Sequence, residues 1–218
     1  LSELVPDVSA LLNDLDPDVR DTALTTLALL SGTDTEAVTG VAGVLANSDD
    51  PEKRRYAAFL CGVLHDEARL ALLLKDEDAR VRKGAVQGLS QLAGGDAVHY
   101  LILALTDEDP DVRSAAATTL GESHRKEAVD ALALAARDTD PWVRCAALRS
   151  LGRVGGSRAL PEIEAALDSS DGLLSLAALE ALAGIEGETS LNLIRRATEG
   201  EDGNVVKFAM EILEQRRD

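Results

Sequence analysis

The sequence predicts an all-α solenoid, a stack of about seven helix pairs that repeat every 31 residues. A short motif recurs at that spacing along the whole chain of 218 residues. No segment shows the alternating hydrophobic pattern of a half-buried strand. Five aromatic residues in a chain that is 45% hydrophobic leave Leu, Val and Ala to form the core. We therefore expect one domain over residues 1–218 rather than several compact ones.

The repeat is recognised by a five-residue motif, Asp-Pro-Asp-Val-Arg, at residues 16–20 and 109–113. Residues 140–144 differ from it only by Trp142, residues 50–54 and 78–82 are looser copies, and 171–175 and 202–206 are degenerate. The fourth motif residue falls at 19, 53, 81, 112, 143, 174 and 205. The predicted repeats are 1–31, 32–64, 65–94, 95–124, 125–155, 156–187 and 188–218.

Each motif position has a physical role at the start of a helix. The first Asp suits an N-cap, because its carboxylate accepts unpaired backbone N–H groups. Proline suits the first helical position, where its missing N–H is not needed. Counted from the fourth motif residue, position +4 is Ala in every copy and position +8 is Leu in all but one, which has Cys61. These positions share one helical face and predict a buried stripe with a small centre.

A second apolar helix precedes each motif, which makes the unit two antiparallel helices. Glycines separate the units and are expected to close the helices as C-caps. These are Gly32, Gly94, Gly95, Gly121, Gly155, Gly156 and Gly187.

The clearest motif copy, Asp140 to Gly152, resembles the HEAT-like repeat of the phycobilisome-lyase type. The resemblance covers essentially the whole chain. It implies a right-handed stack of helix pairs with a concave surface lined by the second helices. Members of the family are mostly scaffolds, with some chromophore lyases, a metal-dependent hydroxylase and DNA glycosylases, so the fold alone does not select a function.

Charge and composition narrow the function classes. A net charge of −17 argues against a general nucleic-acid binder, because polyanions attract basic surfaces. No signal-like segment and no apolar run of membrane-spanning length is present, so we expect a cytoplasmic protein without membrane contact. Asp outnumbers Glu and Arg outnumbers Lys, a bias similar to that of proteins from salt-accumulating archaea. An ordinary acidic bacterial protein is the alternative.

The motif arginines suggest either an anion site or a structural ladder with acidic side chains of the turns. We predict the ladder for Arg20, Arg54, Arg82, Arg113 and Arg144, and we expect it to stop where Ser175 and Val206 replace Arg. The acidic turns lack the spacing of a calcium loop and begin helices, so we interpret them as caps.

No catalytic, metal-binding or cofactor-binding residue is expected. His65, His99 and His124 lie in different repeats, and the chain lacks the His-Glu dipeptides that hold metals in the HEAT-like hydroxylase. Cys61 occupies a core position, and Cys145 occupies position +2, which we expect to be exposed. The two are too far apart for a disulfide.

The functional prediction rests on positions +2, +6 and +10 of the second helices, the expected exposed face. This face carries five basic and four acidic side chains, and is therefore nearly neutral in an acidic chain. Exposed aromatic and Arg side chains are typical of binding hot spots. The candidate anchors for a partner are Arg55, Phe59, Trp142, Arg149 and Arg153. In the alternative interpretation, Trp142 packs on the adjacent turn and the arginines are merely solvated.

We therefore predict a non-catalytic scaffold that binds a protein or peptide on the concave face. A chromophore lyase-like or isomerase-like enzyme is the first alternative and rests on the family resemblance. A nucleic-acid repair protein of the alkyl-base glycosylase kind is the second. It would require a basic channel, which the nearly neutral face does not provide.

Overall fold

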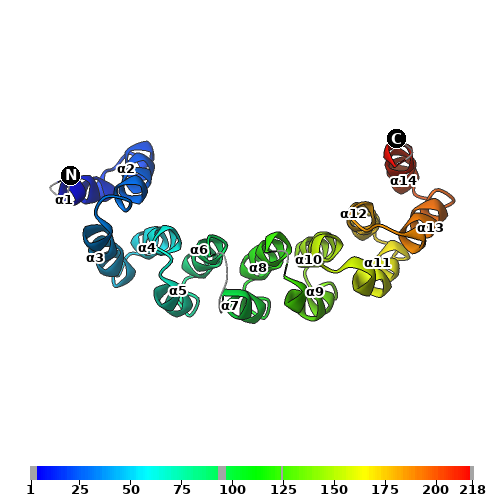
Figure 1. Cartoon of the computed structure of the whole chain (residues 1–218), viewed down its shortest axis with the longest axis horizontal. Helices are drawn as coiled ribbons and strands as arrows, with labels where there is room; N and C mark the ends of the chain where they lie inside the picture. The colour runs from blue at the N-terminus through cyan, green and yellow to red at the C-terminus, as the bar shows by residue number, and fades with distance from the viewer. Residues whose placement is uncertain (1–3, 93–96, 124, 217–218) are drawn as a thin grey trace. The chain divides into compact units, whose positions relative to one another are not determined.

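The computed structural model describes residues 4–92, 97–123 and 125–216, and in these ranges the regular structure is helical, with no strand. Helices follow one another along the whole described chain (Figure 1). The α-helices and 3-10 helices are α1 (Leu4–Ala10), η1 (Leu11–Asn13), α2 (Pro17–Leu30), α3 (Thr35–Ala46), α4 (Pro51–Val63), α5 (Glu67–Leu73), α6 (Ala79–Leu89), α7 (Ala97–Ala104), α8 (Pro110–Glu122), η2 (Lys126–Ala128), α9 (Val129–Ala135), α10 (Pro141–Val154), η3 (Gly156–Ala159), α11 (Leu160–Leu167), α12 (Gly172–Ala183), α13 (Glu188–Ala197) and α14 (Gly203–Gln215).

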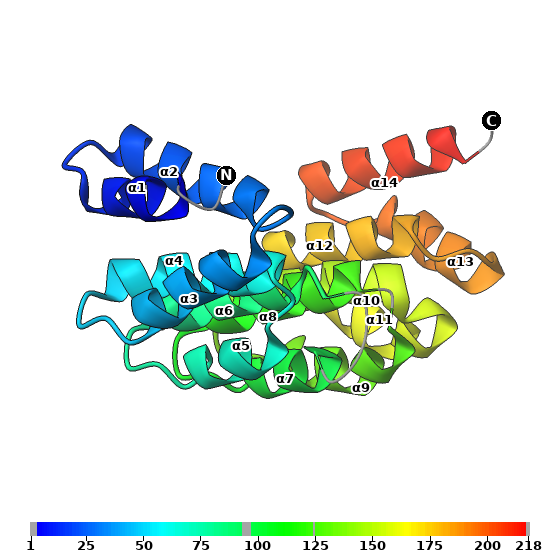
Figure 2. The ribbon, with the colours of Figure 1, turned by 60° about the vertical axis from the view of Figure 1, so that its left-hand side comes forward.

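The chain divides into two compact units, residues 1–100 and 101–218. In unit 1 the second helices of the repeats are α2, α4 and α6, and in unit 2 they are α8, α10, α12 and α14. Within unit 2 these second helices form one layer and α9, α11 and α13 form the other, as Figures 1 and 2 show. Each unit is thus a stack of helix pairs, which confirms the all-α solenoid. The single domain over residues 1–218 stays a prediction.

Every second helix begins at the motif aspartate, as the sequence predicts. In each of the seven copies the carboxylate accepts the backbone N–H two residues later, at 2.8 to 3.0 Å. The side chains of the turns therefore satisfy helix N-termini, which is the capping interpretation of the acidic turns. These N-caps are Asp16, Asp50, Asp78, Asp109, Asp140, Asp171 and Asp202.

The predicted buried stripe is present in both units. All seven alanines at position +4 are 0 to 2% exposed. The residue at +8 is buried in six copies, and Leu213 in the last copy is half-buried. The small residue at the centre of the stripe keeps its place in the core without forcing the helices apart.

Neighbouring second helices approach so closely that some positions admit only glycine. A Cβ on Gly152 would lie 2.5 Å from the Cα of Ala181, and a Cβ on Gly62 would lie 2.8 Å from the Cα of Gly88. These contacts hold α10 against α12 in unit 2 and α4 against α6 in unit 1. Backbone contact of this kind leaves little room for sliding between the helices.

The expectation that glycines close the helices is only partly correct. Gly155 is the C-cap of α10, but Gly121 lies inside α8, where its Cβ would meet Ser150 of α10. Gly121 is therefore a packing residue and not a cap. Gly187, with φ +118°, precedes α13 rather than ending α12. Gly94 and Gly95 lie outside the described residues.

The motif arginines tie each turn to its own helix. In all five copies the guanidinium Nη1 donates to the two backbone carbonyls six and five residues earlier in the chain, at 2.8 to 3.2 Å. These carbonyls belong to the turn that precedes the helix, so the turn is fixed by a charged donor rather than by water. In both units the motif arginines therefore have the structural role that the sequence predicts for them.

The same guanidinium also reaches the next turn where an acid is available. Arg54 binds Asp76 through two bonds of 2.7 and 2.9 Å, and Arg113 binds Asp138 through bonds of 2.8 and 2.9 Å. All four side chains are about nine-tenths buried. The hydrogen bond from Arg113 holds the pKa of the Asp138 carboxyl below its ordinary value, although burial opposes that shift. The carboxylate is thus ionised and fully used inside the stack.

The link weakens where serine replaces the acid two residues before the N-cap. Ser169 stands at the position of Asp138 in the next turn, so Arg144 reaches only Asp171, at 3.7 Å. Its Nε is buried and has no acceptor among the described residues. At Ser175, where the motif has no Arg, the single hydroxyl proton has the carbonyls of Leu167, Ser169 and Asp171 as alternative acceptors at 3.2 to 3.4 Å. The ladder therefore stops at Ser175, as the sequence predicts. The weak contact of Arg144 with the turn before it was not predicted.

Replacing Ser169 by Asp should rebuild the missing link. The new carboxylate would accept the Asp171 N–H, as the Ser169 hydroxyl does now, and would pair with Arg144 in the geometry of Asp138 and Arg113. We expect Ser169→Asp to raise the free energy of unfolding by about 1 kcal/mol. Urea denaturation followed by circular dichroism measures this. Ser169→Asn also offers an acceptor to the Asp171 N–H but carries no charge to pair with Arg144, and it is the matched control. Equal effects of the two substitutions would contradict the ladder geometry.

Candidate functional site

The exposed face predicted for the second helices lies outside the core, with one exception. Of the residues at positions +2, +6 and +10, all but one are at least partly exposed in the described structure. The exception is Cys145, which is 0% exposed. The face is therefore available to a partner in each unit, and its five candidate anchors fall on α4 and on α10.

The candidates on α4 in unit 1 are engaged by their own helix. Arg55 pairs with Glu52 at 2.7 Å, and its guanidinium carbon lies 5.3 Å from the centre of the Tyr56 ring. The ion pair with Glu52 raises the pKa of Arg55. Phe59, one turn further along the same face, is half-buried. This pair offers less free surface than the sequence suggests.

The candidates on α10 in unit 2 are more open. Trp142 lies at the start of the helix with 63% of its surface exposed, which argues against the interpretation that it packs on the adjacent turn. Its backbone N–H is fixed by the N-cap Asp140. Arg149 and Arg153 follow seven and eleven residues later, so the three side chains emerge from the same side of α10. An exposed indole held by a rigid helix is well placed for binding.

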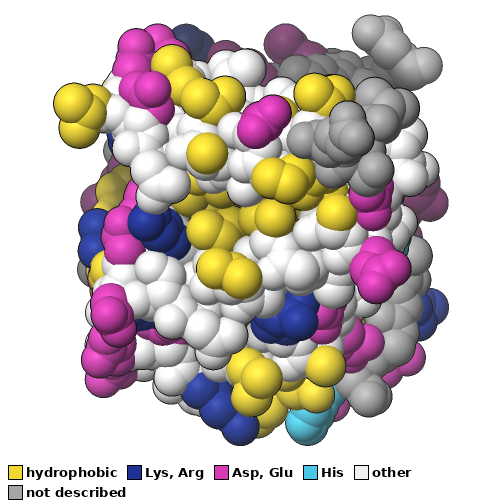
Figure 3. Space-filling view, turned by 90° about the vertical axis from the view of Figure 1, so that its left-hand side faces the viewer, with side chains coloured by type: hydrophobic (Ala, Val, Ile, Leu, Met, Phe, Trp, Pro, Cys, Tyr) yellow, Lys and Arg dark blue, Asp and Glu magenta, His cyan; other side chains and the backbone are white. Residues whose placement is uncertain are grey.

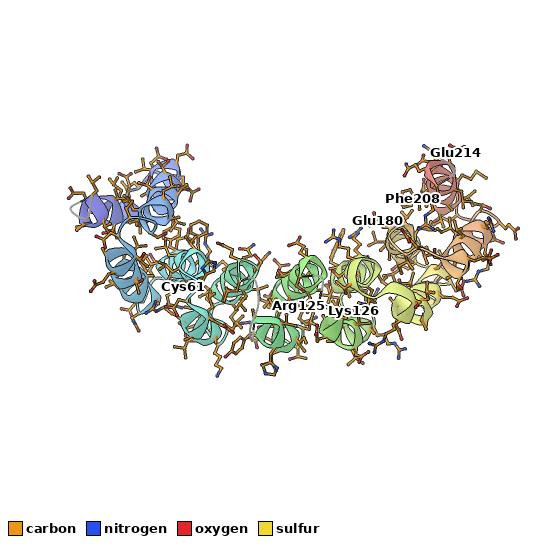
Figure 4. The ribbon with its side chains drawn as sticks, viewed as in Figure 1. Cys61, Arg125, Lys126, Glu180, Phe208 and Glu214 are labelled. Carbon is orange, nitrogen blue, oxygen red and sulfur yellow. The ribbon has the colours of Figure 1, made fainter. Side chains whose placement is uncertain are left out.

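A shallow groove lies between α10 and α12, beside Arg149 and Arg153. It has a volume of about 330 Å³ and is lined by Arg149, Gly152, Arg153, Glu180 and Gly184. Arg149 pairs with Glu180 across the groove, and Figure 4 labels Glu180 on α12. Arg153 is exposed and has no acidic partner in the part of the chain that the structure describes. The groove thus combines one paired and one free guanidinium over a glycine floor.

Cys145 is buried, and the expectation that it is exposed was wrong. The neighbouring helix α12 covers it, with the Leu173 carbonyl 4.0 Å from the Sγ atom. A long side chain at the same position, such as Lys83 in another copy, extends beyond the covering helix, whereas a short thiol does not. Cys61 is also fully buried, and burial raises the pKa of both thiols. Neither has the depressed pKa of a reactive cysteine.

The histidines do not form a cluster among the described residues. His65 is exposed with φ 54°, and His99 lies 6.0 Å from the ring centre of Tyr100. His124 lies outside the described residues. In the described ranges no three His, Cys, Asp or Glu side chains are arranged to hold a metal ion. Among the described helices none is long and apolar enough to cross a membrane.

Two larger cavities lie away from the predicted anchors, and no motif in the sequence predicts either of them. In unit 1, a groove of about 750 Å³ between α1 and α3 is lined by apolar residues that include Val5, Leu12 and Val44. Figure 3 shows hydrophobic side chains gathered on the face of the molecule at its N-terminal side. In unit 2, a cavity of about 610 Å³ lies between the turn at 168–172 and the turn at 199–202. It falls at the repeat where Ser175 replaces the ladder arginine.

Comparison with known proteins agrees with this architecture. Residues 98–183 match the family model of HEAT repeats. No curated protein sequence matches the chain. Among solved structures, an engineered protein is 24% identical and covers 98% of this chain and 68% of its own, with a TM-score of 0.57. The complex of CpcE and CpcF of phycocyanin lyase from Nostoc sp. PCC7120 is 20% identical and covers 69% and 99%, with a TM-score of 0.59. Likeness at this level shows the fold alone.

Because both cysteines are buried, we predict that neither thiol reacts in the folded protein. We expect Ellman's reagent to leave Cys61 and Cys145 unmodified in the folded protein and to titrate two thiols after denaturation in urea. The reagent reacts with an accessible thiolate. Burial blocks its access to both sulfur atoms and also raises the pKa of both thiols, so that little thiolate is present. A Cys145→Ser variant assigns any signal that appears. Fast native labelling that this variant abolishes would contradict the position of Cys145.

Proposed function

We propose that the protein is a non-catalytic scaffold that holds a protein or peptide partner on the second-helix face of unit 2. Trp142 and Arg153 are the anchors, and Arg149 is a positioning residue beside them. The observation that supports this most strongly is Trp142, whose side chain is 63% exposed at the start of α10, the helix whose Arg149 and Arg153 line the groove. Aromatic and Arg side chains are the types that dominate binding energy at interfaces.

The chemistry of the groove favours a partner segment that carries a carboxylate beside an apolar side chain. Arg153 offers a guanidinium with no acidic partner among the described residues, and guanidinium groups bind carboxylates through two parallel bonds. Trp142 offers a flat apolar surface about two helical turns from Arg149. Arg149 stays with Glu180 and helps to position that side of the groove.

Charge supports a protein partner over a nucleic acid. The chain carries a net charge of −17, and the arginines of unit 2 are mostly paired with acids, as in Arg137 with Glu162 and Arg196 with Glu164. A polyanion would meet repulsion from this surface and few free cations. The lyase-like alternative is supported by likeness of fold only, and both thiols of the chain are buried.

The double substitution Trp142→Ala/Arg153→Ala should weaken partner capture while leaving the fold intact. Both side chains are exposed, so we expect unchanged helicity and melting temperature, and retention of the partner reduced by about 30-fold or more. Affinity capture from native lysate at native salt, followed by mass spectrometry and a binding titration, measures this. Trp142 is the only tryptophan, so its shielding from acrylamide on binding reports the same contact.

The matched control is Leu134→Ala/Arg158→Ala, which removes an exposed apolar and an exposed Arg side chain from the first-helix layer of the same unit. It should retain the partner at wild-type strength. Capture by the Trp142/Arg153 variant that equals capture by the control would rule out this site. Visible absorbance that copurifies with the protein would favour the lyase-like alternative instead.

A further inference from the structure

The last second helix, α14, carries an apolar row on its outer side. Val206, Met210 and Leu213 follow one another at spacings of four and three residues, which places them along one edge of the helix. Met210 is 50% exposed, and Val206 and Leu213 are half-buried. Gly203, one step before Val206 in the same row, faces open space, since a Cβ there would meet no atom within 4 Å. The row is thus an uncovered apolar edge.

The equivalent residues of the earlier repeats are covered. Met210 is at position +5 of its repeat, and the six residues at +5 in the other repeats are 0 to 9% exposed. These are Leu24, Ala58, Val86, Ala117, Leu148 and Leu179. Leu213 is likewise the one residue at +8 that is not buried. The edge of α14 is therefore of the kind that another helix covers elsewhere in this chain.

The outward edge of α2, the first of the second helices, is polar instead. At the outward edge of α2 the residues are Asp18, Thr22 and Thr26, where the corresponding positions of α12 are Leu173, Ala177 and Ala181. The outward edge of α2 is thus polar, whereas the edge of α14 is apolar.

Charges beside the row indicate the covering partner. Lys207 and Glu214 flank the row on the same side, seven residues apart, and both are exposed (Glu214 is labelled in Figure 4). Within its own helix Lys207 makes only a long, exposed contact of 3.9 Å with Glu211, which leaves its ammonium group accessible to a partner. Spacings of four and three residues are those of a coiled-coil seam, and Lys207 and Glu214 then occupy equivalent flanking positions. In an antiparallel pair of identical helices such positions face each other, so Lys207 of each copy would meet Glu214 of the other. The row is self-complementary in apolar contact and in charge.

We propose that the C-terminal edge of α14 binds a second copy of this chain. The two α14 helices pack antiparallel about a two-fold axis, with Met210 at the centre and two Lys207–Glu214 pairs at the flanks. A two-fold contact of this kind closes on itself and yields a dimer rather than a filament. Because each copy carries a charge of −17, salt that screens the repulsion between copies strengthens the association.

Sedimentation velocity over a range of micromolar concentrations, in dilute and in molar KCl, tests the dimer. The wild-type protein should be dimeric in molar KCl, and Met210→Glu should be monomeric because it buries two charges at the axis. Met210→Leu keeps the apolar contact and should remain dimeric. A wild-type protein that stays monomeric at every concentration and salt would overturn the proposal and leave the edge to a different partner.

A charge exchange tests the antiparallel arrangement specifically. Lys207→Glu and Glu214→Lys should each weaken dimerisation by about tenfold, and the double variant Lys207→Glu/Glu214→Lys should restore it, because the exchanged charges again face each other between copies. Circular dichroism confirms that each variant folds. A double variant as weak as the single ones would exclude this pairing. The Trp142→Ala/Arg153→Ala variant should dimerise as the wild type does, so the two proposals fail independently.

Discussion

The guanidinium group of the motif arginine is the interaction on which the repeat stack depends. A solenoid of helix pairs has no sheet to connect its turns, and the backbone carbonyls of those turns would otherwise rely on water. Arg113 satisfies the carbonyls of Asp107 and Glu108 and simultaneously binds Asp138 of the next turn. One side chain therefore holds its own turn in place and sets the distance to the following turn. Removing it would leave buried acceptors and a buried carboxylate unpaired, which is far more costly than losing a surface ion pair.

This arrangement also explains which surface is free for function. The acids of the turns are committed to N-caps and to the ladder, and the alanine stripe fills the core between helices. Apart from the buried Cys145, the side chains on the exposed face of the second helices take part in neither. Trp142 and Arg153 lie on that face in unit 2, on a helix whose start is fixed by Asp140 and whose backbone touches α12 at Gly152. A rigid helix presents both side chains at little cost in conformational entropy on binding.

Much of the fold could be predicted because the N-cap and the central alanine each occur in all seven repeats and the motif arginine occurs in five. The N-caps, the Ala positions and the arginine ladder all follow from motif register, and the structure confirms them. The errors concern residues whose environment is set by the neighbouring helix. Cys145 occupies an exposed register position, but α12 covers it, and Gly121 looks like a helix end but is a contact with Ser150. The pairing of Arg149 with Glu180 and the uncovered edge at Met210 likewise depend on how adjacent repeats approach, which a single repeat does not encode.

A double-mutant cycle on Arg113 and Asp138 tests the central role of the ladder most directly. The free energies of unfolding of Arg113→Ala, Asp138→Ala and the double variant give the coupling between the two side chains. We predict a coupling of about 1–3 kcal/mol, because the pair is bidentate and nearly nine-tenths buried. The exposed pair Arg158 and Asp130, whose side chains are 65% and 85% exposed, should give less than about 0.5 kcal/mol in the same experiment. Equal, small couplings for both pairs would show that the ladder does not hold the stack together.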